Sequence, residues 1–371
     1  MPGPDITRPK SRRAAILSHF LRSVIWAGAA VALLAQPFAG HAAWKTSQGH
    51  FRTAQSQAPQ SQNPQPQSGA APAPAASSSA QQNPNENGTF VIRKDVDEVL
   101  LHATVVDDKQ RIVTDLDKAA FTVYEDGKPQ NIISFHHEDI PVAMGIVIDN
   151  SGSMREKRAK VNQAALNLVR SSNPEDEVFV VNFNDEYYLD QDFTNDLLKL
   201  KEALEKIDAK GGTAFYEAVV ASAGHLKMNA RLERKVIFVV TDGEDNASRE
   251  TLEEAVKQLQ EENGPSVYAI GILGDEEHPK RAKRALEIIA QRTGGIAFFP
   301  RTLDEVDEIS RQVAHDIRNQ YTIGYKPTNP RASGGFRQIR VEAKVKGHSK
   351  MVVRTKSGYY AGSQGARAGM K

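Results

Sequence analysis

Residues 142–153 read VAMGIVIDNSGS, and this stretch decides the fold. Val142 to Ile148 is an unbroken apolar run, which is typical of a strand that is buried on both faces of a parallel sheet. Asp149, Ser151 and Ser153 follow at every second position. In open α/β sheets, ligands bind at the carboxyl ends of the strands, so polar oxygens at this point indicate a binding site.

Strand and helix patterns alternate from residue 141 to residue 319, which predicts one α/β domain over this range. Strands are expected at Val142–Ile148, Glu177–Phe183, Val236–Thr241, Val267–Ile272 and Ile296–Phe299, with a short edge strand at Tyr187–Asp192. Helices are expected at Glu250–Glu262 and Lys280–Arg292, with another beginning near Glu156. The alternation predicts a doubly wound, mostly parallel six-stranded sheet with helices on both faces.

Strand patterns without helices flank this domain, at residues 90–140 and 320–361. Asp126-Gly127 lies between β-forming residues and marks a tight hairpin turn. Alternation gives one buried face to Ile339, Val341, Ala343 and Val345. Each segment is small for a core of its own, and the two ends of a doubly wound domain often lie near each other. We therefore expect both segments to pair in one small β-sandwich.

The N-terminus has the order of a secretory signal peptide at residues 1–42. Basic residues precede the apolar run Val24–Ala35, small residues follow it, and cleavage is expected after Ala42. The arginine pair within Ser11–Leu17 also resembles part of a twin-arginine export signal. The apolar run is shorter than the ~20 residues that span a bilayer, so membrane contact is expected only if this segment stays uncleaved as an anchor. These features predict an exported protein, whether periplasmic, at the cell surface or secreted.

Composition separates the remaining segments and limits the function. Residues 43–89 are rich in Gln, Pro, Ala and Ser and predict a disordered linker, and residues 362–371 predict a disordered tail. The 371-residue chain has a formal net charge of +1 and no basic stripe, so no nucleic-acid partner is expected. It has no cysteine, which excludes disulfides, iron–sulfur clusters and thiol catalysis.

Two further stretches can join Asp149, Ser151 and Ser153 at the same edge of the sheet. Gly211-Gly212-Thr213 offers a hydroxyl on a loop that glycines allow to approach closely. Asp242 follows a second apolar strand and offers another carboxylate. All of these groups are hard oxygen donors, which suit Mg²⁺, with Ca²⁺ or Mn²⁺ as alternatives, rather than zinc or copper.

These parts, in this order, resemble the metal-ion-dependent adhesion site of von Willebrand factor type A domains. The family pattern is Asp-x-Ser-x-Ser, then a Thr, then an Asp in a Thr-Asp-Gly setting. Five residues match it: Asp149, Ser151, Ser153, Thr213 and Asp242. The resemblance covers residues 141–319, and the flanking β segments look like those of bacterial exported proteins that carry this domain.

The resemblance implies a Rossmann-like fold and a metal centre that binds proteins rather than an enzyme. In such sites the two serines bind the metal directly, while the threonine and the aspartates bind it directly or through water. An open position is then filled by a Glu or Asp of the protein partner. The resemblance therefore implies divalent-metal-dependent protein interaction or adhesion, with Mg²⁺ as the expected ion.

The same residues allow other interpretations. The stretch DNSGS alone can be a strand-to-helix turn with capping side chains. A metal-dependent hydrolase acting outside the cytoplasm is the alternative function, but it needs a positioned base, and the histidines lie outside the three loops. The run at 136–139, HHED, could bind a transition metal but is expected to be a connector. Asp245 and Asn246 could support the metal ligands from behind, but they are expected to cap the next helix or to lie in the loop.

Overall fold

The structure is a computed structural model that describes residues 98–206, 208–274, 279–330, 333–345 and 350–362. The predicted signal peptide at 1–42, the predicted linker at 43–89 and residues 363–371 of the predicted tail lie outside this range. Among the described residues, no helix combines the length and the apolar character that a membrane span requires.

A mixed sheet forms the centre of the α/β domain. Its strands are β5 (Val142–Asp149), β6 (Glu177–Phe183), β7 (Tyr187–Thr194), β8 (Arg234–Thr241), β9 (Ser266–Gly271) and β10 (Ala297–Phe298). They lie in the order β10-β9-β8-β5-β6-β7. All neighbours run parallel except β6 and β7. The predicted doubly wound, mostly parallel sheet of six strands is confirmed, and β7 is the predicted edge strand.

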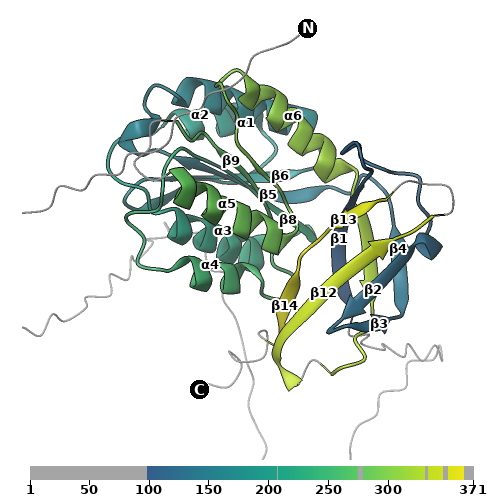
Figure 1. The fold of residues 1–371 in the computed structure, drawn as a ribbon. Helices are drawn as coiled ribbons and strands as arrows, with labels where there is room; N and C mark the ends of the chain where they lie inside the picture. Colours follow the sequence, from purple (N-terminus) through teal and green to yellow (C-terminus); the bar gives the residue numbers. More distant parts are fainter. Residues whose placement is uncertain (1–97, 207, 275–278, 331–332, 346–349, 363–371) are drawn as a thin grey trace, which may run out of the picture. The chain divides into compact units, whose positions relative to one another are not determined.

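Helices cover both faces of this sheet (Figure 1). One face carries α1 (Arg158–Ser171), α2 (Leu197–Glu205) and α6 (Glu305–Arg318), and the other carries α3 (Phe215–Asn229), α4 (Leu252–Leu259) and α5 (Pro279–Thr293). Met144 and Ile146 of β5 belong to the core under α1, whereas Ala143 and Val147 belong to the core under α3. The apolar run is unbroken because both faces of β5 are covered.

The helices agree with the expected ones at their centres and differ at their ends. The helices predicted at 250–262 and 280–292 are α4 and α5. The helix expected near Glu156 is α1, which begins two residues later, after a short 3-10 turn at Gly152–Met154. This turn carries the chain away from the sheet edge before the helix starts.

The two flanking segments pair with each other. The first contributes β1 (Val99–Val106), a 3-10 turn (Lys118–Ala120), β2 (Phe121–Glu125), β3 (Lys128–Gln130) and β4 (Ile132–His136), and the second contributes β11 (Tyr321–Tyr325), β12 (Gly335–Ala343), β13 (Val352–Arg354) and β14 (Gly358–Ala361). Their sheets have the orders β13-β1-β11-β4 and β14-β12-β2-β3. Each sheet mixes strands from both segments, so the predicted β-sandwich is confirmed.

Local detail in the sandwich follows the sequence with one exception. Asp126 and Gly127 connect β2 to β3 with φ values of 49° and 77°, as a two-residue hairpin turn requires. Ile339, Val341 and Ala343 are buried as predicted. Val345, predicted on the same face, is 36% exposed. The prediction is wrong there because β12 ends at Ala343, so Val345 no longer follows the alternation of the strand.

A buried ion pair lies in the sandwich core. Arg337 of β12 donates to Glu125 Oε1 of β2 at 3.1 Å, and both side chains are 2% exposed. Tyr325 and Tyr359 donate their hydroxyls to Glu125 Oε2 at 2.5 Å and 3.0 Å. Burial raises the pKa of both tyrosines, which keeps them as neutral donors. The buried carboxylate is thus paired and hydrogen-bonded, as a buried charge must be.

Buried polar side chains also connect the sandwich to the α/β domain. Gln320, next to β11, donates to Tyr268 Oη of β9 at 3.0 Å and accepts from Arg234 of β8 at 2.9 Å. Asp316 of α6 accepts from Tyr268 Oη at 2.7 Å and from Arg354 of β13 at 2.8 Å. Because loss of a partner would leave a buried polar group unpaired, at a cost of about 1–3 kcal/mol, these contacts hold the two parts in one arrangement.

Candidate metal centre

The predicted site residues come from strands that are neighbours in the sheet. β5 ends at Asp149 and β8 ends at Thr241, and the register pairs Ile148 with Val240. β6 lies on one side of β5 and β8 lies on the other, so the strand order reverses at β5. The structure therefore places Asp149 and Asp242 together at the switch point, where open α/β sheets bind ligands.

Three loops meet at this edge and are tied to one another by their backbones. Gly152 N donates to Gly211 O at 3.2 Å, which joins the first loop to the second. Asn246 N donates to Thr213 O at 3.0 Å, and Thr213 N donates to Asn246 Oδ1 at 2.8 Å, which joins the second loop to the third. Thr213, 3% exposed, is thereby held beside the two strand ends.

The glycines of the second loop are needed for this close approach. Gly211 has a φ of +77°, and a Cβ there would lie 2.0 Å from Asp185 Oδ2. At Gly212 a Cβ would lie 2.7 Å from Asn246 Oδ1. Asp185 Oδ1 also accepts from Gly212 N at 2.8 Å. A side chain at either glycine would push the loop away from the residues that position Thr213.

Asp149 is a buried carboxylate with few compensating contacts. Its side chain is fully buried, its Oδ1 accepts from Ser151 N at 2.7 Å, and its Oδ2 accepts from Thr241 Oγ1 at 2.6 Å. Burial raises the pKa of Asp149 from 3.8 to about 6, although these hydrogen bonds lower it, and the nearby Asp242 raises it further. A carboxylate in this state is stabilised by a cation placed next to it.

Two serines connect the carboxylates, Ser151 through its backbone N–H on Asp149 and both serines through their hydroxyls. Ser151 Oγ lies 3.1 Å from Ser153 Oγ, and Ser153 Oγ donates to Asp242 Oδ1 at 2.8 Å. Asp242 is fully buried, and its Oδ2 accepts from the Lys157 ammonium. Asp149, Ser151, Ser153 and Asp242 therefore form one hydrogen-bonded group, and Thr213 lies in the loop that Gly211 O ties to Gly152 N.

The donor set fits a hard divalent cation. It offers two buried carboxylates and three hydroxyl residues, which are oxygen ligands of the kind that Mg²⁺, Ca²⁺ and Mn²⁺ take. The ammonium of Lys157 against Asp242 shows that this place stabilises positive charge. The residues that would hold the ion are Asp149, Ser151, Ser153, Thr213 and Asp242, and an ion bound there would supply an electrophilic centre for an oxygen ligand.

Several residues that shape the centre were missed by the sequence reasoning. Thr241 belongs to the Thr-Asp-Gly stretch, but its hydrogen bond to Asp149 depends on the pairing of β5 with β8. Lys157 lies four residues after Ser153, which is one helical turn and is the only sequence signal for its position. Asp185 shapes the Thr213 loop through a contact between distant segments. Asn246 was considered from the sequence as a residue that supports the ligands, and its Oδ1 accepts from Thr213 N.

Asp245 lies in the loop between β8 and α4, as the second of its two expected roles has it. It does not cap α4, because its Oδ2 accepts from Tyr216 N at 2.7 Å, at the start of α3. The next helix, α4, has its own capping box, formed by Thr251 and Glu254. Asp245 therefore caps the preceding helix, because the loops pack so that the third one covers the beginning of α3.

The HHED run does not gather metal ligands in the part of the chain that the structure describes, where no group of three or more His, Cys, Asp or Glu side chains is placed to hold an ion. His137 stacks on Tyr321, with ring centroids 4.4 Å apart, and burial lowers the pKa of His137. Asp139 pairs with Arg318 at 2.7 Å. These contacts agree with the connector interpretation.

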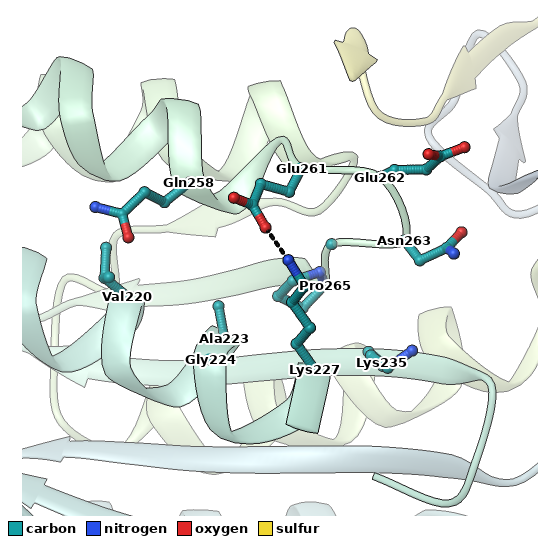
Figure 2. Close-up of a pocket in the computed structure, with 11 residues that line it drawn as sticks. Val220, Ala223, Gly224, Lys227, Lys235, Gln258, Glu261, Glu262, Asn263 and Pro265 are labelled. Atoms are coloured by element: carbon teal, nitrogen blue, oxygen red, sulfur yellow. Dashed lines mark hydrogen bonds and ion pairs between the residues drawn. The ribbon is translucent and has the colours of Figure 1, made fainter. Parts of the chain in front are cut away.

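A separate cavity of about 140 Å³ lies at the opposite edge of the sheet and takes no part in the metal centre (Figure 2). Its lining includes Lys235, at the beginning of β8, together with residues of α3 and residues after α4. Lys227 and Glu261 point toward each other across it and form an ion pair of 2.5 Å. These two charged side chains thus contact each other, far along the strands from Asp149.

Comparison with known proteins gives one family match and several solved structures of low identity. Residues 144–244 match the family model described as von Willebrand factor type A domain. No curated protein matches the chain. A von Willebrand factor type A structure from Catenulispora acidiphila has 15% identity and a TM-score of 0.43, with 74% of this chain and 75% of that chain covered.

Two further solved structures are similar at the level of the fold alone. The PilB minor pilin from Streptococcus sanguinis has 14% identity and a TM-score of 0.41, with 48% of this chain and 62% of the pilin covered, which is less than two thirds of the pilin's length. The corresponding domain of the type V pili tip protein Mfa5 from Porphyromonas gingivalis has 14% identity and a TM-score of 0.39, with 49% and 97% covered. Residues 144–244, a range that includes Asp149, Ser151, Ser153, Thr213 and Asp242, are therefore similar to a von Willebrand factor type A domain.

Proposed function

We propose that this protein binds other proteins through a divalent cation held at the carboxyl edge of the central sheet. The ion is Mg²⁺, with Ca²⁺ or Mn²⁺ as alternatives, and its ligands are Asp149, Ser151, Ser153, Thr213 and Asp242. A Glu or Asp of the partner completes the coordination. The observation that carries this proposal is the pair of fully buried carboxylates, Asp149 and Asp242, linked through Ser151 and Ser153: Ser151 N donates to Asp149, and the two serine hydroxyls continue the contact to Asp242.

The burial of the ligands gives the direction from which a partner approaches. Asp149, Ser151, Thr213 and Asp242 are buried, whereas Ser153 and the neighbouring Gly152 are exposed. The ion is therefore held from below by carboxylates and is reached from the side of Ser153. Because hydroxyls are neutral and two carboxylates only balance its charge, an ion there still attracts a further carboxylate.

A metal-dependent hydrolase is less well supported. A His–Asp pair does exist, because His225 Nε2 lies 2.9 Å from Asp192 Oδ1. Asp192 lies on β7 between the residues that pair with Val180 and Val178, near the start of β6 and away from the edge that Asp149 occupies. A base there cannot reach an ion held by Asp149 and Asp242, so binding is preferred over catalysis.

Export belongs to the same proposal and rests on the signal pattern of residues 1–42. A partner would then be a protein outside the cytoplasm that presents an acidic side chain. The pattern lies outside the described residues, so its test is separate. Mass spectrometry of the mature N-terminus should identify Ala43 as the first residue, and an intact Met1 in the exported protein would contradict cleavage.

The binding proposal is tested with the purified protein immobilised and exposed to the exported proteome in Mg²⁺ and in chelator. Partners that bind only in Mg²⁺ are expected, and Asp149→Asn and Asp242→Asn should lose them. Asp304→Asn, at an exposed side chain on the outer surface, is the matched control and should keep them. Conversion of the partner's critical Glu or Asp to its amide should also abolish binding. Full binding in excess chelator would overturn the mechanism.

A further inference from the structure

Lys157 is the residue directly before α1, and its ammonium contacts Asp242 Oδ2. The lysine side chain is 22% exposed, whereas that of Asp242 is fully buried. The contact therefore joins a buried carboxylate to a cation whose stem reaches toward solvent. Such a side chain can turn outward without disturbing a packed core, because the lysine ammonium is carried on a flexible four-carbon stem.

Both oxygens of Asp242 already have partners. Oδ1 accepts from Ser153 Oγ at 2.8 Å, and Oδ2 accepts from Lys157. A metal ion that binds Asp242 can reorient the serine hydroxyl, whose proton turns away while its oxygen remains a donor atom. The ammonium has no lone pair to offer, and its positive charge repels the ion across a short distance in a buried setting.

We infer that Lys157 is the internal counter-ion of Asp242, which a divalent cation must displace, and that this exchange sets the affinity and the charge selectivity of the metal centre. The inference rests on the proposed metal-dependent function. A monovalent cation would replace one positive charge by another and gain nothing at the carboxylates. A divalent cation brings an additional charge, so only it has an electrostatic reason to expel the ammonium.

The neighbouring basic residues direct their hydrogen bonds and ion pairs to other groups than Asp242. Arg155 donates to Ala209 O at 3.2 Å and is directed at the backbone of another loop. Arg158 donates to Leu204 O at the base of α2. Lys160, one turn further along α1, pairs with the exposed Asp304. Lys157 is therefore the cation that the ion meets at Asp242, and Lys160 provides a matched control on the same helix.

The experiment measures Mn²⁺ binding by electron paramagnetic resonance and Mg²⁺ binding by calorimetry, in the wild type, Lys157→Met, Lys160→Met and Asp242→Asn. Lys157→Met should bind both ions at least about ten-fold more tightly, since a positive charge next to the ion is removed while the apolar stem is kept. Na⁺ should compete with Mn²⁺ more strongly in Lys157→Met than in the wild type. Lys160→Met should match the wild type.

A second measurement follows the lysine itself. Acylation of Lys157 by an amine-reactive reagent, read by mass spectrometry, should become faster when Mg²⁺ is added, while acylation of Lys160 should not change. Unchanged or weaker Mn²⁺ binding in Lys157→Met, with binding lost in Asp242→Asn, would overturn this inference and leave the proposed function standing. No binding in either the wild type or Lys157→Met would overturn both.

Discussion

Thr241 at the end of β8 donates its hydroxyl hydrogen to Asp149 Oδ2 at the end of β5, over 2.6 Å, and both side chains are fully buried. Water cannot replace this donor, so Thr241→Val should lower the free energy of unfolding by about 1–3 kcal/mol. Urea denaturation in chelator measures the change. Thr241→Ser keeps the hydroxyl and should lower the free energy of unfolding by less than Thr241→Val does. Equal losses in the two variants would assign the effect to packing of the methyl group.

Mg²⁺ should stabilise the folded protein, because the unfolded chain has no assembled site. At a free concentration of 100 times the dissociation constant, the free energy of unfolding should rise by about 2.7 kcal/mol. Asp242→Asn should abolish this rise, and Asp304→Asn should leave it intact. Differential scanning calorimetry with and without Mg²⁺ provides the measurement. A rise of the same size in Asp242→Asn would place the ion elsewhere.

Asp245 should prove structural rather than metal-binding. Its carboxylate accepts from Tyr216 N at the beginning of α3 and from Ser248 N in its own loop. Asp245→Ala should therefore reduce the free energy of unfolding by about 0.5–2 kcal/mol, as loss of a helix cap does. Calorimetric titration of Asp245→Ala should give the same Mg²⁺ affinity as titration of the wild type. A large loss of affinity would make Asp245 part of the metal centre.

Asp176 should give the metal-free protein a pH dependence. Burial raises its pKa from 3.8 to about 6. The folded state then holds the proton more tightly than the unfolded state, so this contribution to stability is present below pH 3.8 and is lost as the pH rises through about 6. Asp176→Asn keeps an acceptor for Val142 N, which donates to Asp176 at 2.8 Å, and removes the titration.

Asp176→Asn should consequently exceed the wild type in stability at neutral pH, by at most about 3 kcal/mol, and match it near pH 4. Urea denaturation across this pH range, in chelator, measures both. A constant difference at all pH values would show that the amide changes packing and that titration of Asp176 is not the cause.

Removal of one partner of the buried Arg337–Glu125 pair should strongly destabilise the fold. Arg337→Met leaves the carboxylate buried without its cation, which should lower the free energy of unfolding by about 3–5 kcal/mol. Arg340, on the same strand, pairs with Glu342 at the surface, and Arg340→Met should cost about 0–1 kcal/mol. Chemical denaturation compares them, and similar losses in both would show that burial of the pair does not matter.

The sequence predicts the parts of this fold that depend on local pattern. A few residues are enough to recognise the apolar run of β5, the alternation of β12 and the Asp126-Gly127 turn. This is because burial of a strand, or the φ values of a turn, restricts which residues can occupy neighbouring positions. Asp149 and Asp242 could be predicted to lie close together because both follow strand ends, where the topology of a doubly wound sheet brings distant segments together.

Contacts between segments could not be found in this way. Lys157 and Asp242 are 85 positions apart, and nothing local to either distinguishes their contact from a solvated charge. Asp245 has the composition of a cap for the following helix, yet it caps the preceding one because of how the loops pack. The end of β12 at Ala343, which exposes Val345, likewise depends on where its pairing with β2 stops.

The position of β1 between β11 and β13 has a consequence for biosynthesis. Both neighbours of β1 are encoded after the whole α/β domain, so β1 leaves the ribosome with both hydrogen-bonding edges free. It keeps them free until residues 321–325 and 352–354 have been synthesised. Free strand edges can pair with other chains, so a nascent chain of this protein carries an aggregation-prone element from the synthesis of residue 106 until that of residue 354.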